Sequence, residues 1–306
     1  TAGFGDTTLT SAGGRDAFIA KLNADGSYAW ATKVGGSGYK SRGDITSLSD
    51  GSSIVIGKFS IAKLNADGTY TWATKAGGSN FKGSGITSLS DGSSIVTGYF
   101  GGTASFGDIT LTSAGFWDVF IAKLNADGTY AWATKAGGGS GDYANGITSL
   151  SDGSSIVTGY FGGTASFGDI TLTSAGYEDA FIAKLNADGS YAWATKAGGG
   201  WERNQSCSAH GITSLSDGSS IVTGTFYGKT SFGDTTLTSG GGYSAFITKL
   251  NADGSYAWAT KTGGSSHDSG YGITSLSDGS SIVTGTFYGT ASFGDTTLTA
   301  AGSYDA

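Results

Sequence analysis

Two short segments recur five times each along this chain, and this internal repetition constrains the fold more than any other feature. The first reads AFIAKLNADGSYAWATK at Ala17 and returns in near-copies at Ser60, Val119, Ala180 and Ala245. The second reads GITSLSDGSSIVTG in its common form, with first isoleucines at Ile86, Ile147, Ile212 and Ile273 and an altered copy from Asp44. Such self-similarity is typical of arrays in which each copy is one supersecondary unit.

Both segments read as β-hairpins. In the first, FIAKL and YAWATK flank Asn-Ala-Asp-Gly, and in the second, ITSLS and SSIVTG flank Asp-Gly. Asp-Gly between β-branched and aromatic runs is a strong hairpin signal. No stretch shows a capped apolar stripe at helical spacing, so we expect essentially no helix.

Two hairpins per unit of about 60 residues predict an all-β, five-bladed β-propeller of four-stranded antiparallel blades, a usual size for this architecture. The chain begins with the first hairpin and ends with the second. Pairing 17–33 with 273–285 would complete a fifth blade, so that both termini close the ring of a single domain, 1–306. A parallel β-helix is the competing solenoid, but hairpins of this type do not belong in it.

A glycine-rich excursion separates the two hairpins of a blade. The excursions start near Thr1, Gly101, Gly162, Tyr227 and Tyr288, whereas none follows Phe59. We hypothesise that the surplus excursion, residues 1–14, fills the vacant slot after Phe59 in the same or a neighbouring chain. Donation between chains would build oligomers or filaments.

These motifs resemble a known family. The pattern FxAKLNxDGxxxWATxxGG, followed by GI…SDGSSIVTGYF and xASFGDxTLTSAG, is similar to the bacterial β-propeller repeat called SBBP and covers nearly the whole chain. The resemblance implies a propeller in an extracellular or surface-anchored protein and no particular catalytic residues. The apparent five blades and the short second unit depart from the seven blades in the family's name.

The differences between the copies concentrate in two places, the link into the second segment and the end of the excursion. Strand alternation puts both places at one end of the blades, where loops on a rigid scaffold often carry recognition. Many of these residues are aromatic or charged, as at binding hot spots. The candidate ligand-binding residues are Tyr39, Arg42, Phe81, Lys82, Trp117, Asp142, Tyr143, Tyr177, Glu178, Trp201, Arg203, His267, Asp268 and Tyr271. Neutral drift in exposed loops is the alternative explanation.

Chemical sites are harder to find. Glu202, Cys207 and His210 share one connection, but their spacing matches no metal or nucleophile signature, so we predict no enzyme, no metal and no cofactor. Asn125, Asp127 and Gly128 look like part of a calcium loop. A calcium loop needs more oxygen ligands over a longer stretch, so we interpret these residues as a tight turn.

Composition narrows the class of partner. The net charge is −7, charged residues make up 13%, and Glu occurs only at Glu178 and Glu202. This balance excludes the basic footprint of nucleic-acid binding, and no run is apolar enough to insert into a membrane. With one cysteine and many Gly, Ser and Thr residues, the chain fits a bacterial exterior. It starts at Thr1 rather than Met, so we expect a processed or excised piece.

The function predicted from these observations is a recognition module for carbohydrate or a cell-surface protein. The alternative is a structural surface, adhesive or filament-forming subunit.

Overall fold

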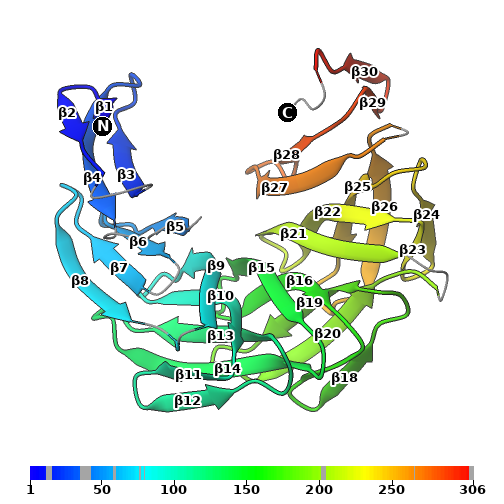
Figure 1. Cartoon of the computed structure of the whole chain (residues 1–306), viewed down its shortest axis with the longest axis horizontal. Coiled ribbons are helices and arrows are strands. Elements are labelled where there is room, and N and C mark those ends of the chain that lie inside the picture. Colours follow the sequence, from blue (N-terminus) through cyan, green and yellow to red (C-terminus); the bar gives the residue numbers. More distant parts are fainter. Residues whose placement is uncertain are drawn as a thin grey trace.

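Antiparallel hairpins account for all regular structure in the residues that the computed structural model describes, which are 1–11, 16–34, 43–57, 60–75, 77–78, 80–200, 205–264 and 266–302. Four complete four-stranded blades lie in the middle of the chain (Figure 1). Blade I contains β5 (Asp44–Ser47), β6 (Ser53–Ile56), β7 (Ser60–Leu64) and β8 (Tyr70–Lys75). Blade II contains β9 (Asn80–Ser88), β10 (Ser94–Gly101), β13 (Asp118–Leu124) and β14 (Tyr130–Gly138). Blade III contains β15 (Asp142–Ser149), β16 (Ser155–Phe161), β19 (Asp179–Leu185) and β20 (Tyr191–Ala197). Blade IV contains β21 (Ser206–Ser214), β22 (Ser220–Tyr227), β25 (Ser244–Leu250) and β26 (Tyr256–Thr262).

Shorter hairpins flank these blades. The N-terminal half-blade is β3 (Ala17–Leu22) with β4 (Tyr28–Val34), and the C-terminal half-blade is β27 (Ser269–Ser275) with β28 (Ser281–Thr286). The excursions form side hairpins, namely β1 (Ala2–Phe4) with β2 (Thr7–Leu9), β11 (Thr103–Phe106) with β12 (Ile109–Thr112), β17 (Thr164–Phe167) with β18 (Ile170–Thr173), β23 (Lys229–Phe232) with β24 (Thr235–Thr238), and β29 (Thr290–Phe293) with β30 (Thr296–Thr299).

The Asp-Gly turns form as predicted. At the turn between β3 and β4, Gly26 has a φ of 84°, which glycine adopts without steric cost. The Asp25 carboxylate accepts hydrogen bonds from the backbone N–H of Ser27 at 2.9 Å and from its hydroxyl at 2.6 Å. These bonds lower the pKa of Asp25. The carboxylate is thus engaged in the turn, which confirms the turn interpretation of this motif.

The innermost strands line the axis of the arc. Strands β5, β9, β15, β21 and β27 contact one another in series. Their serines bond across the blades, with the Ser88 hydroxyl donating to the Ser47 carbonyl at 3.1 Å and the Ser149 hydroxyl donating to the Ser88 carbonyl at 2.9 Å. Ser214 and Ser275 continue the series at 2.9 and 3.1 Å. Small hydroxylated side chains therefore allow these inner strands to approach one another closely.

The apolar core lies between blades rather than within one. Ile54 and Ile56 of blade I pack with Phe81 and Phe120 of blade II, all almost fully buried. Equivalent clusters join blade II to III and blade III to IV. Because each blade buries both of its faces against neighbours, its strands are apolar on both sides.

Tryptophan on the outer strand interlocks successive blades. The Trp132 indole N–H of blade II donates to the Ala187 carbonyl, in the turn of blade III, at 3.1 Å. A Cβ added to Gly189 in the same turn would lie 2.7 Å from that indole ring, so the ring requires glycine there. The same bond recurs from Trp30, Trp72 and Trp193.

Side hairpins extend each outer edge. Strand β17 pairs with β14 of the preceding blade, with Ala136 opposite Phe167. The side hairpin also covers its own blade, since the Phe167 ring lies 5.0 Å from Phe181 and 5.8 Å from Tyr191. Blade I has no side hairpin, and Gly57 instead donates to the Ser60 carbonyl at 2.8 Å.

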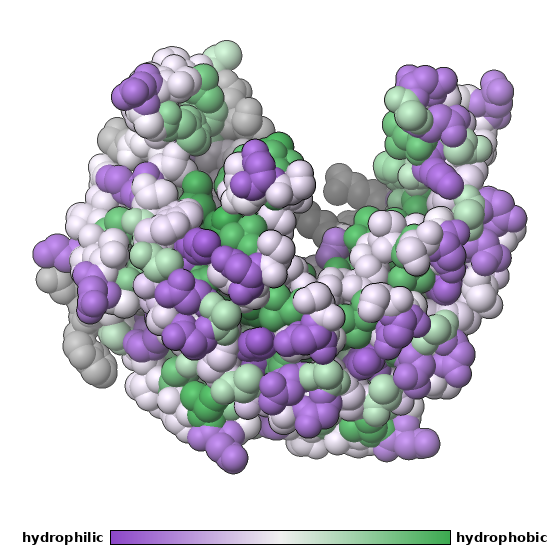
Figure 2. Space-filling model, turned by 180° about the vertical axis from the view of Figure 1, so that it is seen from behind, coloured by the Kyte–Doolittle hydropathy of each residue, from purple (hydrophilic) through white to green (hydrophobic). Residues whose placement is uncertain are grey.

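The five-bladed closed ring is not confirmed. The two half-blades are separate two-stranded sheets at opposite ends of an arc, and the predicted pairing of 17–33 with 273–285 is absent from this structure (Figure 1). Figure 2 shows the ends as two arms with an open notch between them. The angle between blades is set by the side chains packed between them, and the repeat pattern does not encode that angle. Closure therefore stays a prediction.

Candidate functional site

The predicted site residues were assigned to connecting loops at one end of the blades. The antiparallel order of each blade puts the links into the inner strands and the side hairpins at that end, which we call the loop end, and the Asp-Gly turns at the other, the turn end. However, β9, β15 and β21 begin at Asn80, Asp142 and Ser206, so several of these residues belong to inner strands. Tyr39, Arg42, Trp201 and Arg203 lie outside the described residues.

Three predicted ligand-binding residues are buried, which corrects their assignment to an exposed surface. Phe81 stacks on Phe120 with ring centroids 4.4 Å apart. Asp142 and Asp268 accept hydrogen bonds from Gly138 and Gly264 at 2.8 and 2.7 Å. All three occupy the same inward-facing place at the start of an inner strand, so their variation reflects packing.

Three other predicted residues, Lys82, Trp117 and Tyr143, do come together. With two further tyrosines they form an aromatic strip made of Lys82, Tyr99, Trp117, Tyr143 and Tyr160. The Tyr99 ring lies 5.4 Å from Trp117 and 4.7 Å from Tyr143, and Tyr143 stacks on Tyr160 at 4.9 Å. The Lys82 ammonium lies 5.4 Å from the Tyr99 centroid, within range of a cation–π contact. All five side chains are partly exposed.

Tyr99 and Tyr160 were missed by sequence reasoning. Both belong to the run SIVTGYF, which reads as a strand rather than a loop; two later copies carry Thr225 and Thr286 at the same position. Tyr99 and Tyr160 pair across the sheet with Lys82 and Tyr143 of the inner strands. Strand alternation could have found them. Each tyrosine follows a glycine that lies opposite a buried phenylalanine of the third strand, so the tyrosine side chain points to the other face of the sheet.

Tyr177 and Glu178 lie beside the strip. The Tyr177 backbone N–H donates to the Gln205 carbonyl at 3.0 Å, and Cys207 N–H donates to the Glu178 carbonyl at 3.0 Å. Burial raises the pKa of Glu178. Burial also raises the pKa values of Tyr143 and Tyr160, and the Glu178 charge adds to both shifts. The carboxyl group is therefore close enough to act on the tyrosines of the strip.

A tyrosine pocket opens on the other side of Tyr177. Its volume is about 400 Å³, and its lining residues are Tyr177, Ser206, Tyr227 and Tyr243. Tyr177 is 76% exposed, and the Tyr227 and Tyr243 rings lie 5.4 Å apart. The predicted residue His267 lies 5.4 Å from the Tyr243 ring. The strip belongs to blades II and III and the pocket to blades III and IV, and we call the two together the aromatic surface.

Tyr271 is separate from this surface. It stacks on His210 at 5.6 Å, from an inner strand. His210 Nδ1 lies 2.8 Å from the Gly270 carbonyl, and burial lowers the pKa of His210. Cys207 is fully buried, and burial raises the pKa of its thiol. Cys207 packs in the core between blades III and IV, whereas His210, at a β-bulge of β21, contacts Gly270 and Tyr271 of the C-terminal half-blade, so the two side chains lie on opposite sides of the strand.

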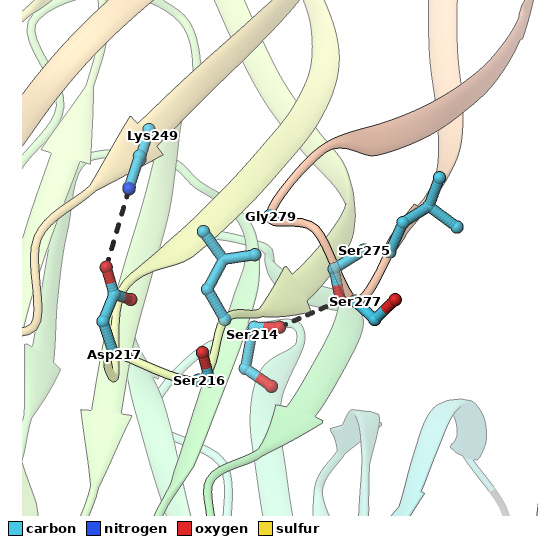
Figure 3. A pocket seen from close by; sticks show the side chains of 9 residues that line it. Ser214, Ser216, Asp217, Lys249, Ser275, Ser277 and Gly279 are labelled. Carbon is cyan, nitrogen blue, oxygen red and sulfur yellow. Dashed lines mark hydrogen bonds and ion pairs between the residues drawn. The ribbon is translucent and has the colours of Figure 1, made fainter.

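A second pocket, of about 410 Å³, lies at the turn end between blade IV and the C-terminal half-blade (Figure 3). The Asp217 carboxylate in it lies 3.7 Å from the Lys249 ammonium and accepts a hydrogen bond from the backbone N–H of Ser219. The Ser275 hydroxyl donates to the Ser214 carbonyl. These lining residues belong to the motifs repeated along the chain, and Asp217, Lys249 and Ser275 make the same contacts as their counterparts in other blades.

A pair of buried carboxylates lies between blades II and III. A Cβ added to Gly137 would lie within 2.9 Å of atoms of both Asp118 and Asp142, so the two carboxylates are close neighbours. Lys135 pairs with Asp118 at 2.9 Å. Burial, with a further contribution from the Asp118 charge, raises the pKa of Asp142 to about 6.

The described residues contain no cluster of three or more His, Cys, Asp or Glu side chains that could hold a metal ion. They also contain no helix that is long and apolar enough to cross a membrane.

Comparisons with known proteins give distant likenesses only. No protein-family model and no curated protein matches the chain, so the SBBP resemblance stays a prediction. A solved protein of unknown function from Bacteroides caccae is similar at 10% identity with a TM-score of 0.42, covering 80% of this chain and 89% of its own. The Neurospora crassa Pan2 WD40 domain is similar at 9% identity with a TM-score of 0.37, covering 87% of this chain and 79% of its own.

Proposed function

We propose that this chain is a non-enzymatic recognition module that binds carbohydrate through the aromatic surface at its loop end. The observation that carries this proposal is the gathering of aromatic side chains, in the strip and in the pocket, at the loop end of three successive blades. Sugar rings present apolar C–H faces that pack on aromatic rings, and ligand sites combine such rings with a few polar groups. Lys82, Glu178 and the tyrosine hydroxyls supply those polar groups.

The size of the tyrosine pocket favours carbohydrate over a protein ligand. At about 400 Å³ it falls within the range of small-ligand sites. A cell-surface protein is the other ligand class for the same surface, and it would require a larger contact area. The low charge and the single cysteine support an extracellular or cell-surface location for either activity.

The one cysteine and the nearest histidine are not paired with each other, and this supports a non-enzymatic role. Cys207 faces blade III and His210 faces the C-terminal half-blade, and burial raises the pKa of the Cys207 thiol. No reaction is therefore assigned to this pair.

A glycan array on the purified chain tests the proposal. Tyr177→Ala removes the most exposed wall of the pocket, and Tyr143→Ala interrupts the strip, so each should weaken glycan binding by about tenfold, the loss of one stacking contact of roughly 1.4 kcal/mol. Phe116→Ala is the matched control for Tyr177, because Phe116 occupies the same place in the preceding blade and is also exposed. Binding that survives both tyrosine substitutions, or an array without signal, would refute carbohydrate recognition here.

A structural subunit that assembles with other copies is the second proposed function. The unpaired half-blades favour it, because they leave strand edges free at both ends of the arc. Self-association through residues 1–14 is one route. In the structure Phe4 of this segment packs on its own half-blade, 4.6 Å from Phe18 and 5.6 Å from Tyr28. The slot after Phe59 lies outside the described residues.

A further inference from the structure

We propose that the two half-blades are the two sides of a head-to-tail interface, in which β28 of one copy pairs with β3 of a second copy. The inference deepens the second proposed function and is independent of glycan binding. Among the described strands, β28 has no third-strand partner of the kind that every complete blade has, and β3 has no second-strand partner. Each is a near-copy of a strand that is paired elsewhere in the chain, so the missing partner of each is known.

The complete blades give the register of the missing ladder. In blade III, Thr158 lies opposite Ile182, and Gly159 lies opposite Phe181. Blades II and IV repeat these pairs. The same register places Thr284 of one copy opposite Ile19 of the other, and Gly285 opposite Phe18.

A phenylalanine ring over a glycine fits the two strands together. A Cβ added to Gly159 would lie 2.8 Å from the Phe181 ring, and Gly98 and Gly224 meet Phe120 and Phe246 in the same way. In the half-blades this match is incomplete. The three atoms nearest to a Cβ on Gly285 are backbone atoms of Ser269 and Gly270 rather than ring atoms, and Phe18 is 59% exposed where Phe181 is fully buried.

A buried hydrogen bond accompanies that contact. The Thr158 hydroxyl donates to the Phe181 carbonyl at 2.8 Å, and Thr97 and Thr223 make the same bond in their blades. Thr284 is the counterpart in β28, and the Phe18 carbonyl is the counterpart acceptor in β3. We expect this bond in the interface.

Charge is complementary as well. In the complete blades a third-strand lysine pairs with the aspartate of the Asp-Gly turn, as in Lys184–Asp152 at 3.9 Å and Lys249–Asp217 at 3.7 Å. Blades I and II repeat the pair. Lys21 and Asp278 are the corresponding residues of the half-blades, and neither forms an ion pair with another described residue. The interface would bring them together, which favours this register over a shifted one.

The tryptophan interlock points to the same partner. Trp258 of blade IV is 42% exposed, and its indole N–H has no partner among the described residues. Its counterparts bond to the alanine of the next blade's turn and cover the glycine there. The turn of the N-terminal half-blade has a glycine that no tryptophan covers, because a Cβ on Gly26 would meet nothing within 4 Å. Trp258 therefore fits over Gly26 and donates to the Ala24 carbonyl.

A second copy satisfies these contacts because the two half-blades of one chain lie apart (Figures 1 and 2). Each copy carries one edge of each kind, so association is head to tail and produces either a closed ring of copies or an open filament. One rearrangement accompanies it. Phe293 of the last side hairpin is 43% exposed. In the complete blades the equivalent phenylalanine packs on the third strand, as Phe167 does on Phe181. On β3 that position is already occupied by Phe4, which packs on Phe18. One of the two side hairpins must move aside.

Sedimentation velocity with edge variants tests the interface. The native chain should increase in mass with concentration. Phe18→Ser blocks only β3 and Ile282→Lys blocks only β28, and both side chains are exposed in the free chain, so both variants should fold and remain monomeric. Their equimolar mixture should form dimers and nothing larger, since it retains one functional edge of each kind. Phe116→Ser, at an exposed site away from the half-blades, should assemble like the native chain. A native chain that stays monomeric, or an edge variant that still assembles alone, overturns the proposal.

Cysteine cross-linking separates a second copy from closure within one chain. Ala20 and Val283 are opposite each other in the predicted register, as Ala183 and Val157 are in blade III. Ala20→Cys and Val283→Cys on separate chains should give a covalent dimer after mixing and oxidation. The native chain is the control, because its only thiol, Cys207, is buried. A mixture without cross-links, beside a double variant that forms an internal disulfide as a monomer, would replace the proposal by ring closure.

Discussion

The complete blades and the half-blades carry nearly the same strand sequences but bury them very differently. Strand β19 reads DAFIAKL and is almost entirely buried, whereas β3 reads AFIAKL and has no buried residue. Likewise, Ile156 of β16 is 1% exposed and its counterpart Ile282 of β28 is 54% exposed. Whether a copied strand is buried therefore depends on the strands that pack against it. The strands of a half-blade have the sequence of buried strands but lack the partners that would bury them.

The largest effect should come from the phenylalanine that the two regions share. Phe181→Ala leaves a cavity in a packed core and should lower the free energy of unfolding by about 3–5 kcal/mol. Phe18→Ala removes a ring that is mostly in water and should cost less than about 1.5 kcal/mol in dilute solution. Urea unfolding of both variants measures the difference. Equal losses would show that β3 is covered in solution.

A smaller effect should come from the buried carboxylates, which occur where two complete blades meet. The pKa of Asp142 is raised to about 6, so the folded state holds a proton that the unfolded state has already released. The stability from this proton is present below about pH 4 and is lost as pH rises through 6. Asp142→Asn should thus stabilise the protein by about 1–2 kcal/mol at pH 7, allowing for partial solvation.

Thermal unfolding between pH 4 and pH 8 measures this effect, and the gain from Asp142→Asn should vanish toward pH 4. Asp91→Asn in the turn of blade II is the control of opposite sign. Hydrogen bonds from Ser93 lower the pKa of Asp91, so its removal should destabilise the protein at pH 7. A gain from Asp142→Asn that is the same at every pH would contradict the assignment.

The smallest effect should come from the threonine hydroxyl. Thr158→Val leaves the Phe181 carbonyl without its buried donor and should cost about 1 kcal/mol. Thr284→Val should cost nothing measurable in the dilute chain, because its hydroxyl is at an exposed edge position. Urea midpoints for the two variants test this. If Thr284→Val instead reduces stability only at high protein concentration, the bond forms between copies.

Much of the fold could be predicted from the sequence because its signals are local. Asp-Gly turns fix the hairpins, and the order of hairpins fixes the blades. The inner strands began earlier than predicted, because Tyr143 and Ala144 precede a glycine and look like loop residues, whereas their alternation across β15 is set by pairing with β16. The arrangement of blades around the axis depends on packing between distant residues, so five-fold closure could not be established from the repeat.

The candidate site was predicted in part for the same reason. Variation between copies located Lys82, Trp117, Tyr143 and Tyr177 at the loop end. It also selected Phe81 and Asp142, which vary because each blade interface is packed with a different residue at that place. Tyr99 and Tyr160 complete the aromatic strip, but they lie within a predicted strand rather than in a link between strands, although two later copies carry Thr225 and Thr286 there.

The tryptophan interlock has a consequence for how such a gene can change. Every complete blade carries both halves of the same joint, a tryptophan that reaches forward and an Ala-Asp-Gly turn that receives the tryptophan behind it. Recombination that adds or removes one whole unit in frame therefore creates a junction that already fits. The number of units can therefore change without disturbing the contacts between blades, whereas adding or removing part of a unit leaves one tryptophan and one turn unmatched.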